Sequence, residues 1–333
     1  MRSTHLPTLS TVNILHWMQE NIADQSGKTI LITGANSGIG FWTAHIFAQF
    51  GAHVILGCRS THKAIDAVST IKQDYPNATL DIVEINLADQ ESIKQASRDI
   101  LSRFQSIDIV IHNAGISSPA TEHDQNGTNL TFATNHLGTY ALTAHILPLL
   151  LANPLSRIVT QSSITHQLHF LRPRFDRYLT PHTTQNHAYA DSKLANLLFA
   201  RHLQRLLRRN GHPQFSLAAH PGLALTQINQ LSHSLHYTDF WSDIKEGAFN
   251  RLGLRTANAL GLCQPFQIAG ALPAVYAAVC DLHSRDFYFG PNGTLGLLGI
   301  PTACHTSRYA QCPNLASQLW QISEKMTGLK IKM

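Results

Sequence analysis

The residues best suited to chemistry are a tyrosine and a lysine four positions apart. Tyr189 and Lys193 fall within a helical pattern over residues 187–210, so their side chains should share one face of the helix. A phenol titrates near a pKa of ~10, and a neighbouring ammonium favours the phenolate and draws that pKa toward neutrality. Such a tyrosine can give a proton to a carbonyl oxygen or take one from an alcohol. The spacing alone is common by chance.

A second chemical signal lies near the start of the chain. An apolar run over residues 28–33 is followed by Gly34, Gly38 and Gly40, and then by a helical pattern over residues 38–50. Glycines in a strand-to-helix turn let the backbone approach a pyrophosphate, and the helix N-terminus offers free N–H groups to it. The spacing is Gly-x-x-x-Gly-x-Gly, and the turn predicts a dinucleotide site that includes Gly34, Asn36, Ser37, Gly38, Ile39 and Gly40.

The end of the second expected strand bears on which dinucleotide binds. A carboxylate there would bond the ribose hydroxyls of NAD, whereas an arginine favours the 2′-phosphate of NADP. The chain has no carboxylate at this point but has Arg59, which can pair with a phosphate through two parallel hydrogen bonds. We therefore predict NADP(H) as the preferred cofactor, with NAD(H) as the alternative.

Composition narrows the function classes. The 333 residues carry a net charge of +5 without a dominant basic cluster, so nucleic acid is not an expected partner. The five cysteines form no Cys-x-x-Cys pair, and the twenty histidines show no metal-ligand spacing, so no metal is expected. No signal peptide and no transmembrane span is evident, which favours a cytoplasmic protein, and peripheral membrane contact stays open.

Short apolar strands alternate with helical patterns along the chain. This alternation predicts an α/β fold, a Rossmann-type doubly wound parallel sheet of about seven strands with helices on both faces. We expect a polar leader over residues 1–27 and a single domain over residues 28–333, with substrate-side insertions near residues 165–185 and 222–264. Strands are expected at 29–33, 53–57, 79–85, 107–111, 157–161, 215–219 and 286–289, and helices at 12–21, 38–50, 61–74, 90–104, 127–151, 187–210, 264–281 and 306–326.

Taken in order, these motifs resemble the short-chain dehydrogenase/reductase family over essentially the whole chain. The stretch 192–196, the segment Tyr288 to Pro291 and the pair Leu319–Trp320 look most like its retinol-dehydrogenase-like branch. The residues that carry the family resemblance are Thr33 to Gly40, Asn113 to Gly115, Asn135 to Gly138, Ser162 and Ser163, Tyr189 and Lys193, and Pro221, Gly222 and Thr226.

The resemblance implies a role for each matched position. Tyr189 would be the general acid/base, and Lys193 would lower its pKa and hold the nicotinamide ribose. Ser163 would bond the substrate oxygen, and Asn135 would hold a water that links Lys193 to solvent. The implied cofactor contacts are Arg59, Asn86, Leu87, Asn113, Ala114, Gly115, Tyr189, Lys193, Pro221, Gly222 and Thr226 beside the glycine turn.

Three positions depart from the family pattern. His112 stands where an asparagine is common, Asn86 stands where an aspartate often contacts the adenine, and Gln161 precedes the serine pair without an evident reason. None of these changes touches the four implied catalytic residues. His166 in the loop after the serine pair faces either the substrate or the surface.

The leading interpretation is an NADP(H)-dependent oxidoreductase that interconverts an aldehyde or ketone, apolar in character, and its alcohol. Two alternatives remain: a catalytically silent NADP-binding sensor or interaction protein on the same fold, and an enzyme resembling protochlorophyllide reductase. The family resemblance also allows a homodimer paired through the helices expected at residues 127–151 and 187–210, and implies transfer of the pro-S hydrogen.

Overall fold

The computed structural model describes residues 11–168, 173–184, 186–223, 267–282 and 286–333. Thr226 and the greater part of the insertion expected at residues 222–264 lie outside these ranges. The strands are β1 (Thr29–Thr33), β2 (His53–Cys58), β3 (Leu80–Glu84), β4 (Ile109–His112), β5 (Arg157–Gln161), β6 (Phe215–Ala219), β7 (Tyr288–Pro291) and β8 (Pro301–Ala303). The principal helices are α1 (Thr11–Asn21), α2 (Gly38–Gln49), α3 (Thr61–Asp74), α4 (Gln90–Arg103), α6 (Gly138–Leu151), α7 (Ala188–Arg209), α9 (Gln267–Val279) and α10 (Pro313–Thr327).

The strands form one sheet in the order β3-β2-β1-β4-β5-β6-β7-β8. All neighbours are parallel except β7 and β8. The predicted doubly wound sheet is therefore confirmed, with β8 as an antiparallel edge strand that the sequence pattern did not reveal because it is only three residues long. The chain reverses its direction of growth between β1 and β4, and a crevice at such a point in the carboxyl edge is where these sheets bind ligands.

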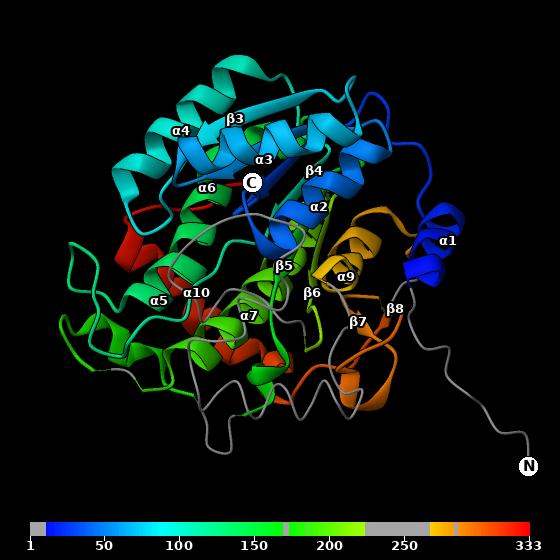
Figure 1. The fold of residues 1–333 in the computed structure, drawn as a ribbon. Helices are drawn as coiled ribbons and strands as arrows, with labels where there is room; N and C mark the ends of the chain where they lie inside the picture. Colours follow the sequence, from blue (N-terminus) through cyan, green and yellow to red (C-terminus); the bar gives the residue numbers. More distant parts are fainter. Residues whose placement is uncertain (1–10, 169–172, 185, 224–266, 283–285) are drawn as a thin grey trace, which may run out of the picture.

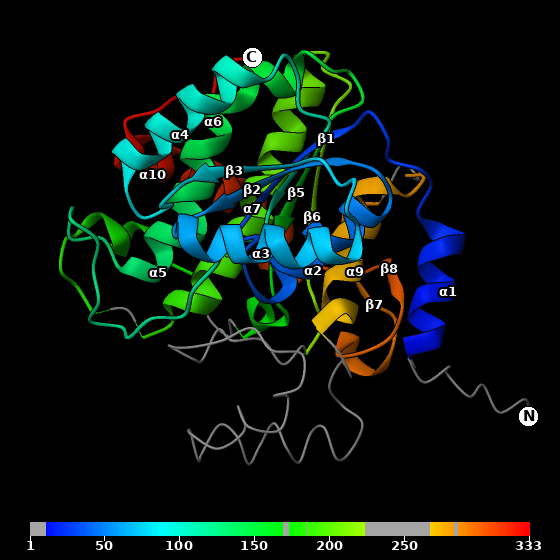
Figure 2. The ribbon, with the colours of Figure 1, turned by 45° about the horizontal axis from the view of Figure 1, so that its top comes forward.

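Helices cover both faces of the sheet (Figures 1 and 2). Side chains alternate along each strand, so Ile30 and Ile32 of β1 pack under α2, α3 and α9, whereas Leu31 packs with α4, α6 and α7. The inner parallel strands β1, β2, β4, β5 and β6 are largely buried, which explains their apolar runs, whereas the edge strand β3 is only partly buried.

Helix α1 lies within the segment expected as a polar leader, yet it packs into the core. Ile14 and Met18 are each 1% exposed, and the ring of Trp17 meets Tyr276 of α9 edge to face, with centroids 5.5 Å apart. The apolar side of this short helix therefore completes the layer beside α9 (Figure 1).

Two expected helices begin later than predicted. The pattern over residues 127–151 contains a turn, then α5 (Leu130–Phe132), a π-helical turn η1 (Ala133–Leu137) and α6. The helical run starts at Leu130 because the Asn129 side chain accepts hydrogen bonds from the next N–H groups, at Thr131 (3.1 Å) and Phe132 (3.2 Å). Likewise α10 begins at Pro313, whose missing N–H suits a first helical position, and not at residue 306.

Helix α10 covers the outer side of α6 and α7. The indole of Trp320 stacks on Phe199 of α7, with centroids 5.8 Å apart, and meets Tyr140 of α6 edge to face at 5.1 Å. The helices through which the family resemblance allows a homodimer are therefore covered in part by the chain's own α10.

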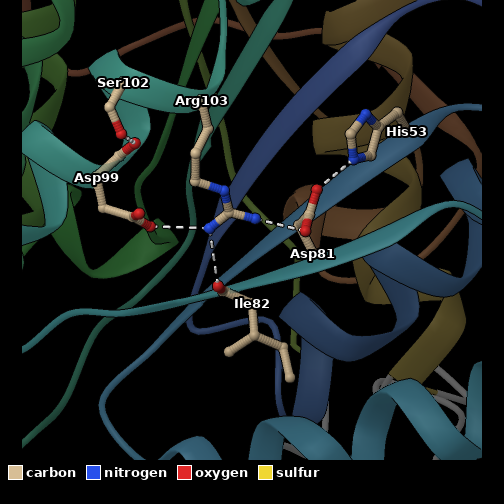
Figure 3. Close-up of polar contacts among 6 residues, drawn as sticks. All are labelled: His53, Asp81, Ile82, Asp99, Ser102 and Arg103. Atoms are coloured by element: carbon tan, nitrogen blue, oxygen red, sulfur yellow. Dashed lines mark hydrogen bonds and ion pairs between the residues drawn. The ribbon is translucent and has the colours of Figure 1, made fainter.

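A polar network ties the end of α4 to the outer strands (Figure 3). The Arg103 guanidinium bonds the carboxylates of Asp81 and Asp99, and Asp81 also meets His53 Nε2 at 2.6 Å. His53 is the first residue of β2, so this network braces the end of the strand opposite the carboxyl edge and leaves that edge free for a ligand.

Candidate active site

The glycine turn after β1 is closely packed against the neighbouring strand. Gly34 (φ +68°) lies so near the chain after β4 that a Cβ atom on it would sit 3.0 Å from Ala114 Cα. A Cβ on Gly40 would overlap the Gly34 carbonyl oxygen and Asn113 Nδ2. The positions expected to be glycine for close approach are thus required by the protein's own backbone as well.

Asn113 braces this turn from β4. Its side-chain Nδ2 donates to the Thr33 carbonyl oxygen at 2.9 Å, and its backbone N–H donates to Thr33 Oγ1 at 3.1 Å. The Ala114 N–H donates to the same hydroxyl at 3.0 Å. Asn113 therefore shapes the glycine turn through both its side chain and its backbone.

The N-terminus of α2 fits an anionic group. Ser37 is the N-cap residue but makes no side-chain capping hydrogen bond, so it leaves the first-turn N–H groups uncapped. Gly38 (φ +56°) faces open space, since a Cβ on it would meet nothing within 4 Å. An uncapped twelve-residue helix beside open space is a suitable cradle for a pyrophosphate.

Arg59 is exposed just beyond β2, at the start of α3. On the neighbouring strand β3, the carboxylate of the last residue, Glu84, accepts a hydrogen bond from Thr61 Oγ1 at 2.6 Å. Beyond β3, the Asn86 side chain accepts from the Ala88 N–H at 3.2 Å, and Leu87 packs so tightly on α6 that Gly138 has no room for a Cβ. These residues line the carboxyl edge on the β2–β3 side.

Helix α7 brings Tyr189 and Lys193 together as their spacing predicts. Lys193 Nζ lies 5.5 Å from the centroid of the Tyr189 ring and donates to the Gln161 carbonyl oxygen at 3.4 Å. The Ser163 side chain lies near enough to the Tyr189 hydroxyl to lower its pKa. Asn135 completes the group, because a Cβ on Gly115 would lie 3.1 Å from Lys193 Nζ and 3.4 Å from Asn135 Oδ1.

Asn135 occupies the π-helical turn η1, and its amide is fully engaged. Oδ1 accepts from the Ile116 N–H at 2.8 Å, while Nδ2 donates to the Ile116 carbonyl oxygen at 2.9 Å and to Ser192 Oγ at 3.0 Å. Asn135 thus fastens the chain after β4 to α7 beside Lys193. Single π turns of this kind are frequent at functional sites.

Burial dominates the protonation of both titrating groups. It raises the pKa of Tyr189 above its usual value, and the nearby Ser163 side chain offsets that shift only in part. It also lowers the pKa of Lys193 to about 8. The net pKa shift of Tyr189 is therefore upward, opposite to the lowering expected from a neighbouring ammonium, because desolvation of the phenolate is its largest cause.

The Ser163 loop is held by a buried histidine. His166 Nδ1 lies 2.6 Å from the Ser163 carbonyl oxygen, and Nε2 accepts from the Ser307 N–H at 3.3 Å. The ring is fully buried and packs edge to face on Tyr288, with centroids 5.5 Å apart. His166 therefore faces neither substrate nor surface, the two options left open by the sequence, but supports Ser163 from behind.

A similar arrangement supports the turn after β6. Gly222 (φ +72°) donates its N–H to His220 Nδ1 at 3.3 Å, and Leu223 donates to the Leu297 carbonyl oxygen at 2.8 Å. Burial lowers the pKa of His220 to about 3, so the ring stays neutral and keeps Nδ1 as an acceptor. Pro221 and Gly222 thereby lie at the carboxyl edge beside β7.

Asp191 makes contacts that the sequence motifs do not predict. This carboxylate, 1% exposed on α7, accepts from the hydroxyl of Tyr178 at 2.6 Å and pairs with Arg177. Both partners belong to a short 3-10 helix, η3 (Phe175–Leu179), in the expected insertion near residues 165–185. The pairing fixes this insertion to the helix that carries Tyr189, and no local spacing could have revealed it.

Several features are absent from the described ranges. They contain no group of three His, Cys, Asp or Glu side chains arranged to hold a metal ion. None of the helices defined there is both long enough and apolar enough to cross a membrane. The four cysteines found there are all free thiols.

The chain is similar to several known proteins. A family model described as short chain dehydrogenase matches residues 28–234. The chain is 39% identical over 313 residues to bovine (Bos taurus) dehydrogenase/reductase SDR family member 13, a match that covers 92% of this chain and 75% of that protein. The human protein of that name is 40% identical, but the match spans only 51% of its length and 59% of this chain.

Two further matches extend the comparison. Mouse (Mus musculus) retinol dehydrogenase 12 is 34% identical over 239 residues, which cover 70% of this chain and 75% of that protein. The crystal structure of an uncharacterised protein from Mycobacterium paratuberculosis superposes with a TM-score of 0.71 at 30% identity, covering 94% of this chain and 98% of that one.

Proposed function

Because the chain belongs to the short-chain dehydrogenase family, we propose that it is an NADP(H)-dependent oxidoreductase that interconverts an apolar aldehyde or ketone and its alcohol. The observation that carries the proposal is that Tyr189 and Lys193 lie on one helix face, with Lys193 Nζ 5.5 Å from the Tyr189 ring and the Ser163 side chain near the phenol. It unites a proton donor and a second hydroxyl at one point of the carboxyl edge.

The residues present fit a nicotinamide dinucleotide. The turn from Gly34 to Gly40, with the uncapped start of α2, would hold the pyrophosphate. Arg59 would hold the 2′-phosphate, and Lys193 the nicotinamide ribose. The other residues proposed to line the bound cofactor are Asn86, Leu87, Asn113, Ala114, Gly115, Tyr189, Pro221, Gly222 and Thr226. The nicotinamide, when bound, supplies or accepts the hydride.

The protein's own contribution is to hold the substrate oxygen and move a proton. The hydroxyls of Ser163 and Tyr189 would both bond that oxygen and stabilise the charge that develops on it. Since burial keeps Tyr189 protonated, the phenol is ready to donate its proton to a carbonyl oxygen, which favours reduction. Asn135 would keep the chain at Ile116 in place beside Lys193. It would also hold a water molecule through which protons pass between Lys193 and solvent.

An apolar substrate is proposed from the resemblance to retinol dehydrogenase 12. NADPH oxidation should therefore be faster with long-chain or polyene aldehydes, retinaldehyde among them, than with short polar ones. Tyr189→Phe should lower kcat by about 10²–10⁴-fold, while Tyr75→Phe, which removes a hydroxyl at the end of α3, should leave kcat within twofold of wild type. Equal turnover by wild type and Tyr189→Phe would refute the role of the phenol.

Preference for NADP(H) is expected to rest on Arg59. Arg59→Leu should weaken NADPH binding by roughly 10–100-fold, because a charge-assisted hydrogen bond to the 2′-phosphate contributes about 1.5–3 kcal/mol. NADH has no such phosphate, so its affinity should change by less than about threefold. Titration of wild type and Arg59→Leu with both cofactors measures the difference, and an equal loss of affinity for NADPH and NADH would show that Arg59 does not bind the 2′-phosphate.

A further inference from the structure

Gln161, the last residue of β5, carries a buried amide without a partner. The residue is 4% exposed, and neither Oε1 nor Nε2 makes a hydrogen bond to any residue that the structure describes. Its backbone oxygen, in contrast, accepts from both Lys193 Nζ and Asn196 Nδ2. A buried amide with two unpaired atoms is costly, so it calls for a partner from outside these residues.

The register of the sheet places this amide under one half of the dinucleotide crevice. Side chains alternate along β5, so Gln161 projects from the same face as Val159, which packs in the layer with α2 and α9. Gln161 is paired with Ala219, two residues before Pro221. A dinucleotide in a doubly wound sheet spans the edge from the switch point. When the adenosine half of the dinucleotide lies over β1, β2 and β3, its nicotinamide half lies over β4, β5 and β6.

The chemistry of the amide selects among the groups that could reach it. A glutamine side chain presents one acceptor and an NH₂ donor in one plane. A carbonyl substrate would use Nε2 alone and leave Oε1 unpaired. A primary carboxamide offers both complementary groups in the same plane and satisfies both atoms.

We propose that the side chain of Gln161 pairs with the carboxamide of the bound nicotinamide, with Oε1 accepting from the carboxamide NH₂ and Nε2 donating to its oxygen. This inference rests on the proposed cofactor, although it does not depend on turnover. Because the Gln161 backbone oxygen also holds Lys193, one residue would fix both the nicotinamide plane and the lysine beneath its ribose.

Binding by calorimetry to Gln161→Leu tests the pairing with three ligands. NADP⁺ affinity should fall by roughly 5–50-fold, as expected for two neutral hydrogen bonds. The 3-acetylpyridine analogue of NADP⁺ lacks the NH₂ donor, so wild type should bind it more weakly than NADP⁺ and the variant should discriminate little between them. 2′,5′-ADP, which has no nicotinamide, should bind both proteins equally.

Gln214→Leu is the matched control. Gln214 is also buried, at 2% exposure, but its Nε2 donates to the carbonyl oxygens of Leu151 and Asn153 at the opposite edge. This control should lower the melting temperature of the unliganded protein and leave NADP⁺ binding unchanged. Gln161→Leu should leave that temperature unchanged or raise it, because it removes an unsatisfied group.

Two results would overturn the pairing: unchanged NADP⁺ affinity in Gln161→Leu, or a melting temperature lowered as in Gln214→Leu with equal losses for all three ligands. Either one leaves the proposed function intact if Tyr189→Phe still loses turnover. Binding of 2′,5′-ADP without any binding of NADP⁺ or NADPH by wild type would overturn both.

Discussion

Lys193→Met is expected to stabilise the unliganded fold at pH 7 while it abolishes turnover. Lys193 is 3% exposed, and burial lowers its pKa from 10.5 to about 8. Each unit of that shift corresponds to about 1.4 kcal/mol against the charged form, so an apolar side chain of similar length should raise the free energy of unfolding by up to about 3 kcal/mol. The same change removes the cation proposed to act beside Tyr189.

The sign of the pH dependence makes this prediction specific. The pKa of Lys193 is lower in the folded chain than in the unfolded one, so between pH 8 and 10.5 the unfolded chain binds more protons and wild type gains stability as pH rises. The advantage of Lys193→Met should therefore be full below about pH 8 and vanish above pH 10.5. Urea unfolding at pH 7 and at pH 10 measures it.

An exposed lysine provides the comparison. Lys72→Met, on the outer side of α3, should change the free energy of unfolding by no more than about 0.5 kcal/mol at either pH. If Lys193→Met were instead less stable than wild type at pH 7, the ammonium would have to be stabilised by contacts that outweigh its burial.

Gly40→Ala is expected to abolish dinucleotide binding. The added methyl group would overlap the Gly34 carbonyl oxygen and Asn113 Nδ2. Both belong to the brace between β1 and β4, so relief requires the turn itself to move. We expect NADPH affinity to fall by at least about 100-fold and the free energy of unfolding to fall by about 1–3 kcal/mol. Quenching of protein fluorescence by NADPH reports the affinity, and urea unfolding reports the stability.

A second glycine variant separates a loss of folding stability from a loss of cofactor binding. Gly211→Ala introduces the same methyl group at a loop glycine (φ +74°) with no atom within 4 Å, so it should lower stability by roughly 1 kcal/mol through backbone strain and leave NADPH binding unchanged. Wild-type NADPH affinity in Gly40→Ala would show that the turn does not hold the cofactor.

Elements with a strong period could be predicted from the sequence, whereas their boundaries often could not. Strand β1 matches its expected bounds because Lys28 and Gly34 flank an apolar run. The helix expected to start at residue 127 starts at Leu130, because the Asn129 side chain caps it by accepting hydrogen bonds from the N–H groups that follow. Strand β8 exists only through its pairing with β7, a contact that no local pattern encodes.

In the candidate site, too, some features could be predicted from local sequence and others depend on long-range contacts. The four-residue spacing of Tyr189 and Lys193 is a local property, and the helix preserves it. The support that holds Ser163 comes from Ser307 through His166, 141 residues along the chain from that histidine. The unpaired amide of Gln161 depends on burial by distant parts of the chain, which local sequence does not encode. Local spacing therefore predicts which side chains gather, and long-range contacts determine what holds them.

Transfer of a labelled hydrogen tests the central claim most directly. The protein would be incubated with (4S)-deuterated NADPH and a long-chain aldehyde, and the alcohol would be analysed by mass spectrometry. The proposal predicts one deuterium in the alcohol formed by wild type, none from (4R)-deuterated NADPH, and almost no alcohol from Tyr189→Phe. If NADPH binds tightly but no deuterium reaches any aldehyde or ketone tested, the chain is a dinucleotide-binding protein that does not catalyse hydride transfer to carbonyls, and the account given for Tyr189 is wrong.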